Sequence, residues 1–143
     1  EDARAMAVYL KSLPESKPRT QSTPPLVTEQ VRDWLEQGAK IYKKHCEDCH
    51  GASGQGAPGI YPHLAENRGV MLDPPVNAIR IVLNGGYPPS TSGNPRPYGM
   101  PPFAQLLNDG EVALVLSYVR NAWGNRASLV TPEQVDKSRE GLH

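Results

Sequence analysis

The chain has 143 residues, with 15 acidic and 15 basic residues and therefore no formal net charge. This balance provides no long-range field that would favour nucleic acid or an anionic membrane surface, and the length fits one domain, or one domain with an appendage. Fifteen prolines and thirteen glycines predict long loops and a thin core, and no apolar run approaches the length of a membrane span.

Residues 2 to 10 form a short helical pattern without the features of a signal peptide. Residues 14 to 27 contain four prolines among serine, threonine and charged residues, which is the composition of a linker. A helix as short as the first one does not stand alone, so we expect it to dock on this domain or on a partner.

A second helix is predicted to begin after Thr28, whose side chain can cap it. It leads directly into the sequence KKHCEDCHG. Gly38 lies on its apolar face, and since glycine costs helix stability, we expect close contact with another helix there. The other apolar residues recur at helical spacing: Val31, Trp34, Leu35, Ile41 and Tyr42.

Residues 51 to 75 are rich in glycine and proline and predict a loop. Residues 76 to 86 predict a short helix that ends at Gly85 or Gly86. In residues 87 to 103 the density of proline forbids a regular element. The large apolar side chains of this second loop should nevertheless be packed: Tyr87, Tyr98, Met100 and Phe103.

Asn108 and Glu111 form the capping-box start of a helix predicted to run to about Trp123 and Gly124. A last short helix is predicted from Thr131. No period-2 strand pattern and no internal repeat is visible in the sequence. The fold class is therefore predicted as all-α, with three to four helices joined by long loops.

The chain's two cysteines, Cys46 and Cys49, stand three positions apart, and His50 follows directly. A dithiol redox motif usually opens a helix after a strand, whereas this pair follows a helix. A zinc site needs four ligands, and a two-cysteine, two-histidine set would have to recruit His63 and His143. The pattern C-x-x-C-H is typical of covalent haem attachment, and we favour that interpretation.

Electron-transfer haems commonly have a methionine opposite the histidine. Met100 lies in the proline-stiffened sequence YGMPPF, which can hold a sulfur without help from a helix, and we predict it as the second iron ligand. Met71 is the alternative. Met6 and Met71 are otherwise interpreted as core-filling residues.

In order and spacing, residues 36 to 125 resemble the class I cytochrome c domain, through GAKIYKKHCEDCHG, YPHLAEN, IRIVLNGG and MPPFAQLLNDGEVALVLSYVRNAWGN. With the tail WGNRASLVTPEQV, the resemblance extends to cytochrome subunits of bacterial membrane-bound alcohol and gluconate dehydrogenases, which carry three such domains. It implies a C-terminal haem domain at residues 28–126 and a tail at 127–143 with a short helix. Residues 1–13 would be the closing helix of a preceding domain or an N-terminal extension, joined by the linker at 14–27.

The resemblance implies a cytochrome c fold around one haem c, bound covalently through Cys46 and Cys49. It implies His50 and Met100 as the iron ligands. The carbonyl of Pro62 is expected to accept a hydrogen bond from the His50 ring and so to orient it.

Further roles in the haem pocket follow from the same resemblance. Leu64 is expected to pack on the haem, and Gly38 and Tyr42 to cross the last helix near Leu114 and Tyr118. Buried haem propionates need hydrogen-bond donors, and the candidates are Tyr98, Arg80, Tyr87 and Arg96.

The implied function is one-electron transfer, with catalysis left to a partner. The expected partners are a dehydrogenase or neighbouring domain as donor, and a further cytochrome, a quinone or an oxidase as acceptor. Haem attachment of this type takes place outside the cytoplasm, so we expect a periplasmic location, free or held at the inner membrane within a larger cytochrome. The alternative is a haem enzyme or sensor, peroxidase-like or gas-binding, with a labile Met100.

Overall fold

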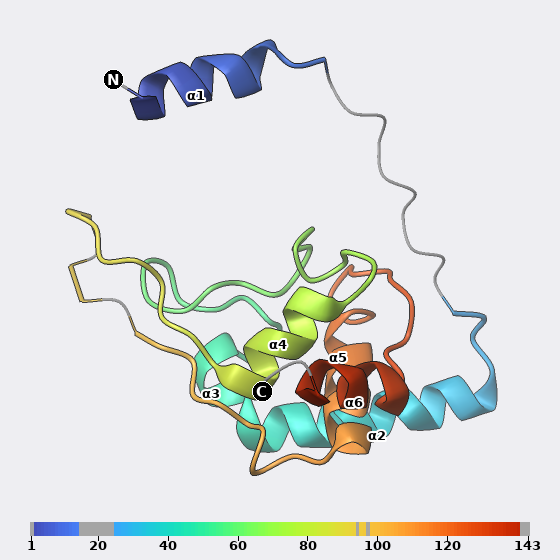
Figure 1. Cartoon of the computed structure of the whole chain (residues 1–143). Coiled ribbons are helices and arrows are strands. Elements are labelled where there is room, and N and C mark those ends of the chain that lie inside the picture. Colours follow the sequence, from blue (N-terminus) through green and yellow to red (C-terminus); the bar gives the residue numbers. More distant parts are fainter. Residues whose placement is uncertain (1, 15–24, 94, 97, 141–143) are drawn as a thin grey trace.

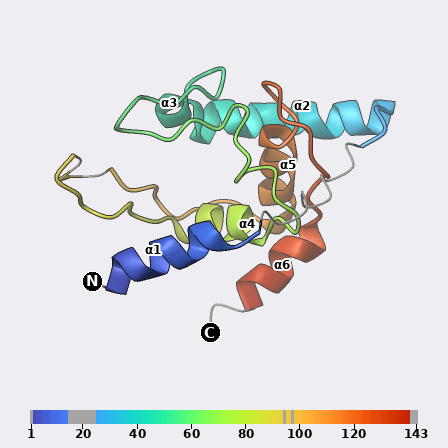
Figure 2. The same cartoon turned by 90° about the horizontal axis from the view of Figure 1, so that it is seen from above.

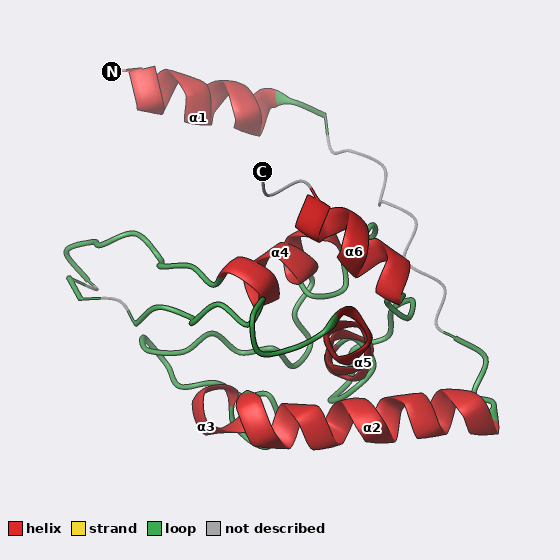
Figure 3. Cartoon of the chain, turned by 60° about the horizontal axis from the view of Figure 1, so that its bottom comes forward, coloured by secondary structure: helices red, strands yellow, loops and turns green. Residues whose placement is uncertain are grey.

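The computed structural model describes residues 2–14, 25–93, 95–96 and 98–140, and the predicted linker lies mostly outside them. Within these residues there are six helices and no strand (Figures 1 and 3), which confirms the all-α class. The expected number of three to four helices is exceeded: the cysteine motif adds a separate helical turn that was not predicted, and the short helices predicted at both ends are present as well. The helices are α1 (Asp2–Ser12), α2 (Glu29–His45), α3 (Glu47–His50), α4 (Val76–Asn84), α5 (Asp109–Val119) and α6 (Pro132–Glu140).

The crossing of α2 and α5 organises the domain. Figure 2 shows α5 running across α2, with α4 and α6 on its other side. A side chain at Gly38 would come within 2.2 Å of the carbonyl oxygen of Leu114, which confirms the expected close helix contact. One turn further, the rings of Tyr42 and Tyr118 lie 5.6 Å apart.

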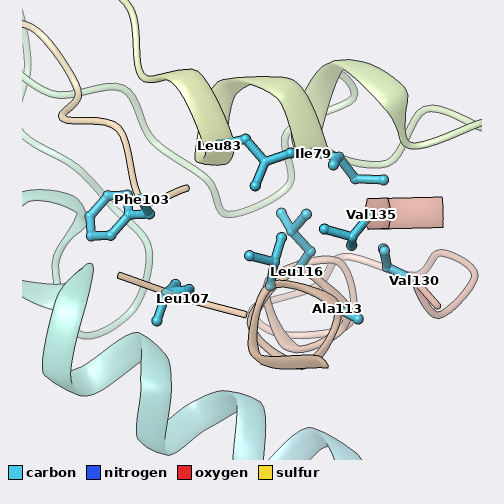
Figure 4. Packing of buried hydrophobic residues seen from close by; sticks show 9 residues of the cluster. Ile79, Leu83, Phe103, Leu107, Ala113, Leu116, Val130 and Val135 are labelled. Atoms are coloured by element: carbon cyan, nitrogen blue, oxygen red, sulfur yellow. The ribbon is translucent and has the colours of Figure 1, made fainter. Parts of the chain in front are cut away.

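The main core lies between α4, α5 and α6, where the facing side chains are aliphatic (Figure 4). Val135 of α6 is fully buried there, so the segment after residue 126 contributes to the same core as the rest of the domain. The cluster consists of Ile79, Leu83, Phe103, Leu107, Val112, Ala113, Leu116, Val130 and Val135.

The predicted helix starts are confirmed, whereas one predicted end is wrong. Thr28 accepts a hydrogen bond from the amide of Val31, and Asn108 with Glu111 forms a complete capping box. However, α5 ends at Val119 instead of continuing to Trp123. Trp123 has φ +51, a left-handed conformation that no α-helix continues through.

Helix α1 has no buried residue, and Figure 1 shows it apart from the other helices. Met6 is 61% exposed, so its interpretation as a core-filling residue is wrong. Tyr9 and Leu10 are equally exposed, at 65% and 64%. Among the described helices, none combines the length and the apolar content that crossing a membrane requires.

Candidate functional site

Two cavities of about 360 and 460 Å³ share six lining residues and lie between the end of α2, α4 and the loop that follows α4. Their volumes fall within the range of about 300–1,000 Å³ that is usual for ligand sites. Most of the side chains that line them are apolar, so the site favours a largely apolar occupant. The shared residues are Cys46, His50, Pro62, Ile81, Met100 and Phe103.

Cys46, Cys49 and His50 come together on the single helical turn that follows α2. Cys46 has φ −125, which ends α2, and its carbonyl oxygen accepts hydrogen bonds from the amides of Cys49 (3.2 Å) and His50 (2.9 Å). All three residues line the first cavity. Neither thiol is in a disulfide, and burial, together with the nearby Cys49, raises the pKa of the Cys46 thiol to about 11.

The ring of His50 is held by the main chain at Pro62. Its Nδ1 lies 3.1 Å from the Pro62 carbonyl oxygen. Because a carbonyl only accepts hydrogen bonds, Nδ1 must carry the proton, which leaves Nε2 with a lone pair. That tautomer is the metal-binding form of a neutral imidazole.

A tight loop brings Pro62 back towards His50. The amide of Gly56 donates to the His50 carbonyl (2.8 Å), and the amide of Ala57 donates to the Tyr61 carbonyl (2.9 Å). Gly56 has φ +62, and a side chain there would come within 2.4 Å of the Tyr61 oxygen. The glycine-rich sequence after the cysteine motif is therefore needed for a close approach of two chain segments.

Met100 is fixed to the C-terminal end of α4 by an isolated two-residue bridge. The amide of Met100 donates to the Gly86 carbonyl (2.8 Å), and the amide of Gly86 donates back to the Met100 carbonyl (3.0 Å). Just beyond, the amides of Phe103 and Ala104 donate to the last carbonyl groups of α4, those of Val82 (3.0 Å) and Leu83 (3.1 Å). The irregular loop thus caps α4 and holds Met100 at both cavities.

The other predicted site residues are divided between the cavities and the surface. Leu64 lines the second cavity. Tyr98 lines the first and is 60% exposed, with its ring 5.6 Å from that of Tyr61. Tyr87 also lines the first cavity, whereas Arg80 is exposed on α4 and lines neither.

Met71, the alternative ligand, does not line either cavity. Its sulfur accepts a hydrogen bond from the amide of Arg126 at 3.4 Å, and the residue is half-buried. This position agrees with the interpretation of Met71 as a packing residue.

Sequence reasoning missed Arg120, which is fully buried and holds a wall of the second cavity. Its Nη1 donates to the carbonyl oxygens of Val70 (2.6 Å) and Leu72 (2.9 Å), and its Nη2 to Asp73 (2.6 Å). Burial lowers the pKa of Arg120, and the Asp73 carboxylate opposes this shift only in part. An arginine side chain nevertheless stays charged in a protein. An arginine just after a helix is normally exposed to solvent at the end of that helix. The sequence around Arg120 contains no signal that its side chain is buried.

Asn125 was missed as well. It is 2% exposed, and its amide group donates to the carbonyl oxygens of Leu64 (2.9 Å) and Val119 (2.7 Å). Asn125 therefore joins the end of α5 to Leu64, one of the residues that line the second cavity. A short polar residue after a glycine gave no sequence signal beyond that of a turn.

A family model described as Cytochrome c matches residues 35–123. The cytochrome c subunit of the quinone alcohol dehydrogenase of Gluconobacter oxydans is 35% identical over 146 residues, covering 97% of this chain and 30% of that subunit. The gluconate 2-dehydrogenase cytochrome c subunit of Pantoea cypripedii is 36% identical over 148 residues, covering 98% of this chain and 33% of that subunit.

A shorter relative matches over nearly its whole length. Cytochrome c-552 of Thermus thermophilus is 33% identical over 127 residues, covering 73% of this chain and 95% of that protein. The chain thus spans about a third of the length of the dehydrogenase subunits that it matches.

Proposed function

The chain belongs to the cytochrome c family, and from this premise we propose that it transfers single electrons through one haem with His50 and Met100 as axial ligands. The family implies a covalently bound haem c that carries electrons. The observation that supports the ligand pair is that His50 and Met100 line the same two cavities although they lie on different elements. When bound, the haem iron supplies a centre that takes up and releases one electron.

The donor set of the cavity fits such a group. Cys46 and Cys49 offer thiols one helical turn apart for two thioether bonds. His50 offers a nitrogen lone pair on a ring that Pro62 orients, and such a bond fixes the ligand and increases its basicity. Met100 offers a soft sulfur, and methionine ligation raises the reduction potential.

With His50 and Met100 both bound to the iron, this protein would be an electron carrier. An iron with two protein ligands has no open position for a substrate or for oxygen. Leu64 and Ile81 contribute to the apolar lining, which would suit the apolar faces of a bound haem. Tyr87 and Tyr98, exposed at the first cavity, mark the side that a redox partner can approach.

Tyr98 stays our candidate for a hydrogen-bond donor to a haem propionate. Arg80 is exposed away from both cavities, so its position does not support the same role for Arg80.

We further propose that the chain is a haem domain of a larger periplasmic cytochrome that receives electrons from a dehydrogenase and passes them towards the respiratory chain. The names of its relatives support this partner. So does α1, because residues 9–13 (YLKSL) are similar in side-chain type to residues 118–122 (YVRNA), where α5 ends. This similarity covers only five residues and is too short to count as an internal repeat. In α5 this tyrosine packs on α2, whereas α1 contacts none of the described helices. It therefore fits the closing helix of a preceding domain, joined by the linker at residues 14–27.

Substitution of the methionines tests the ligand pair. We expect the purified protein to be red and to keep its colour in acid acetone, because the haem is covalently held. In the oxidised protein, Met100→Ala should abolish the red-edge absorption band of methionine-ligated ferric haem and lower the reduction potential. Met71→Ala is the matched control and should change neither.

Two results would contradict the proposal. Loss of the band in Met71→Ala but not in Met100→Ala would make Met71 the ligand. Ready binding of carbon monoxide or cyanide to the unaltered protein at neutral pH would favour the enzyme or sensor alternative.

A further inference from the structure

We propose that Arg139 of α6 is a positioning residue that holds residues 98–107, here called the Met100 loop, against the body of the domain. This inference rests on the proposed ligation by Met100, because the loop matters for electron transfer only if its methionine reaches the iron. The proposal gives the segment after residue 126 a specific role. Neither the cysteine motif nor the residues that line the cavities indicate such a role.

The guanidinium of Arg139 joins three points that belong to other segments. Its Nη1 donates to the carbonyl oxygen of Ala104 at 2.7 Å, and its Nη2 donates to that of Leu107 at 2.6 Å. Its Nε forms an ion pair with the Asp109 carboxylate in the first turn of α5. The planar fork of arginine suits this arrangement, which an ammonium group cannot reproduce. One side chain thus connects α6 to both ends of the turn at residues 104–107.

This turn is rigidly connected to Met100. Between them stand Pro101 and Pro102, whose rings fix φ, and then Phe103, whose side chain lines both cavities. The amides of Phe103 and Ala104 are bonded to α4. A shift of the turn is therefore transmitted along a stiff segment to the methionine.

Helix α6 gives Arg139 a fixed base. Val135, one turn earlier, is fully buried in the core. At its start the side chains of Thr131 and Gln134 form reciprocal hydrogen bonds with each other's amides, at 3.0 and 3.4 Å. Lys137 lies on the same helix and carries the same charge, but its side chain is exposed. It is therefore a suitable control residue for Arg139.

If Arg139 holds the loop, its loss must raise the fraction of molecules in which Met100 has left the iron. An added ligand binds only that open fraction, so its apparent affinity increases in proportion to it. The measurable consequence is easier displacement of methionine by a small competitor such as imidazole.

The experiment uses the complete haem-containing chain and compares Arg139→Met with Lys137→Met. Imidazole is added to the oxidised protein while the methionine-ligation band is followed. We expect the half-displacing imidazole concentration to fall roughly tenfold in Arg139→Met and to stay unchanged in Lys137→Met. Arg139→Lys should give an intermediate value, since it keeps the charge and loses the fork.

Two further measurements separate positioning from a general loss of stability. Val112→Ala, a core substitution in α5 away from the cavity lining, should lower the melting temperature without changing the imidazole concentration. Amide hydrogen exchange at Phe103 and Ala104 should be faster in Arg139→Met than in Lys137→Met, because these amides bond to α4 only while the loop is in place.

The outcomes distinguish the two proposals. If the unaltered protein lacks the methionine band, the ligand assignment fails, while exchange at Phe103 and Ala104 still decides whether Arg139 holds the loop. If Arg139→Met matches Lys137→Met in both exchange and imidazole displacement, the positioning role is overturned. If it changes exchange but not displacement, the role of Arg139 in methionine ligation is overturned.

Discussion

At Gly85 the backbone lies so close to the backbone of Met100 that no side chain would fit between the two segments. Gly85 has φ +65 and ψ −162, a region that only glycine occupies readily. A side chain there would lie 2.2 Å from the carbonyl oxygen of Met100. The residue that ends α4 therefore also sets how closely the predicted ligand loop approaches.

We expect Gly85→Ala to loosen the Met100 loop. The backbone conformation alone costs about 1–3 kcal/mol for a non-glycine residue, and the clash with Met100 adds to it. The methionine-ligation band should weaken, and denaturant unfolding should show lower stability.

Gly86→Ala is the matched control, because its side chain would meet only the flexible end of Ile81, at 3.0 Å. Equal effects of the two substitutions on the band would contradict this role of Gly85.

The chemistry of the site could be predicted residue by residue where the residue type itself carries the signal. The order of Cys46, Cys49 and His50 predicts haem attachment, and the prolines around Met100 favour it over the other methionines as the predicted ligand. Arg120 could not be predicted, because its role depends on two carbonyl groups, 48 and 50 positions away, and on the Asp73 carboxylate, 47 positions away. The sequence of a loop does not show which of its carbonyl groups will turn towards a distant arginine.

At the scale of elements, the contact between α2 and α5 decides the geometry around the cysteine motif. Gly38 lets the two helices approach, and one turn later Tyr42 donates a hydrogen bond from its hydroxyl to the Gly51 carbonyl (2.7 Å). Burial raises the pKa of the Tyr42 hydroxyl, so it keeps the proton that this bond requires. The hydrogen bond from Tyr42 thus connects the crossing of α2 and α5 to Gly51, the residue after His50.

Gly38→Ala should destabilise the protein although alanine is the better helix former by about 1 kcal/mol. The new methyl group would meet a backbone oxygen that cannot move aside, and overpacking of this kind costs about 1–3 kcal/mol or more. The measurement is the free energy of unfolding in denaturant.

Gln37→Ala, an exposed neighbour on α2, serves as the control and should be nearly neutral. A stabilised Gly38→Ala variant would show that the helices can separate without cost.

Element starts were easier to predict than element ends. Thr28, Asn108 and Thr131 have side chains that satisfy nearby amides, and such local bonds are visible in sequence. The segment that follows α5 leaves the helix after Val119 and packs the ring of Trp123 against Tyr42, at 4.9 Å. That contact spans 81 positions, so helical periodicity alone placed the end too late.

At the scale of the whole molecule, the two terminal helices differ in burial. Helix α1 is exposed throughout the described structure, whereas α6 contributes Val135 to the core and Arg139 to the Met100 loop. The sequence predicted both as short helices. Apolar content does not predict which of them is buried, because α1 is rich in apolar residues whereas Val135 is the only aliphatic residue of α6. Only the folded core shows which side chains are enclosed.

Removing residues 1–13 should leave the melting temperature and the methionine-ligation band unchanged, because no buried contact is lost. Removing residues 132–143 should lower the stability by several kcal/mol, since burial of one valine-sized side chain contributes about 1.5–3 kcal/mol. Thermal unfolding of the haem-containing proteins measures both effects. A large loss on removing α1 would mean that it packs on this domain in solution.

The return of α6 to the Met100 loop also sets an order of assembly. Ribosomes make a chain from its N-terminus, at about 5–20 residues per second, so the Cys46–His50 segment emerges first, Met100 later and Arg139 last. The loop therefore receives its final bonds from a side chain synthesised after it. The hydrogen bonds that join α6 to the loop can therefore form only after residue 139 has been made, whereas the attachment motif is already present when residue 50 has been made.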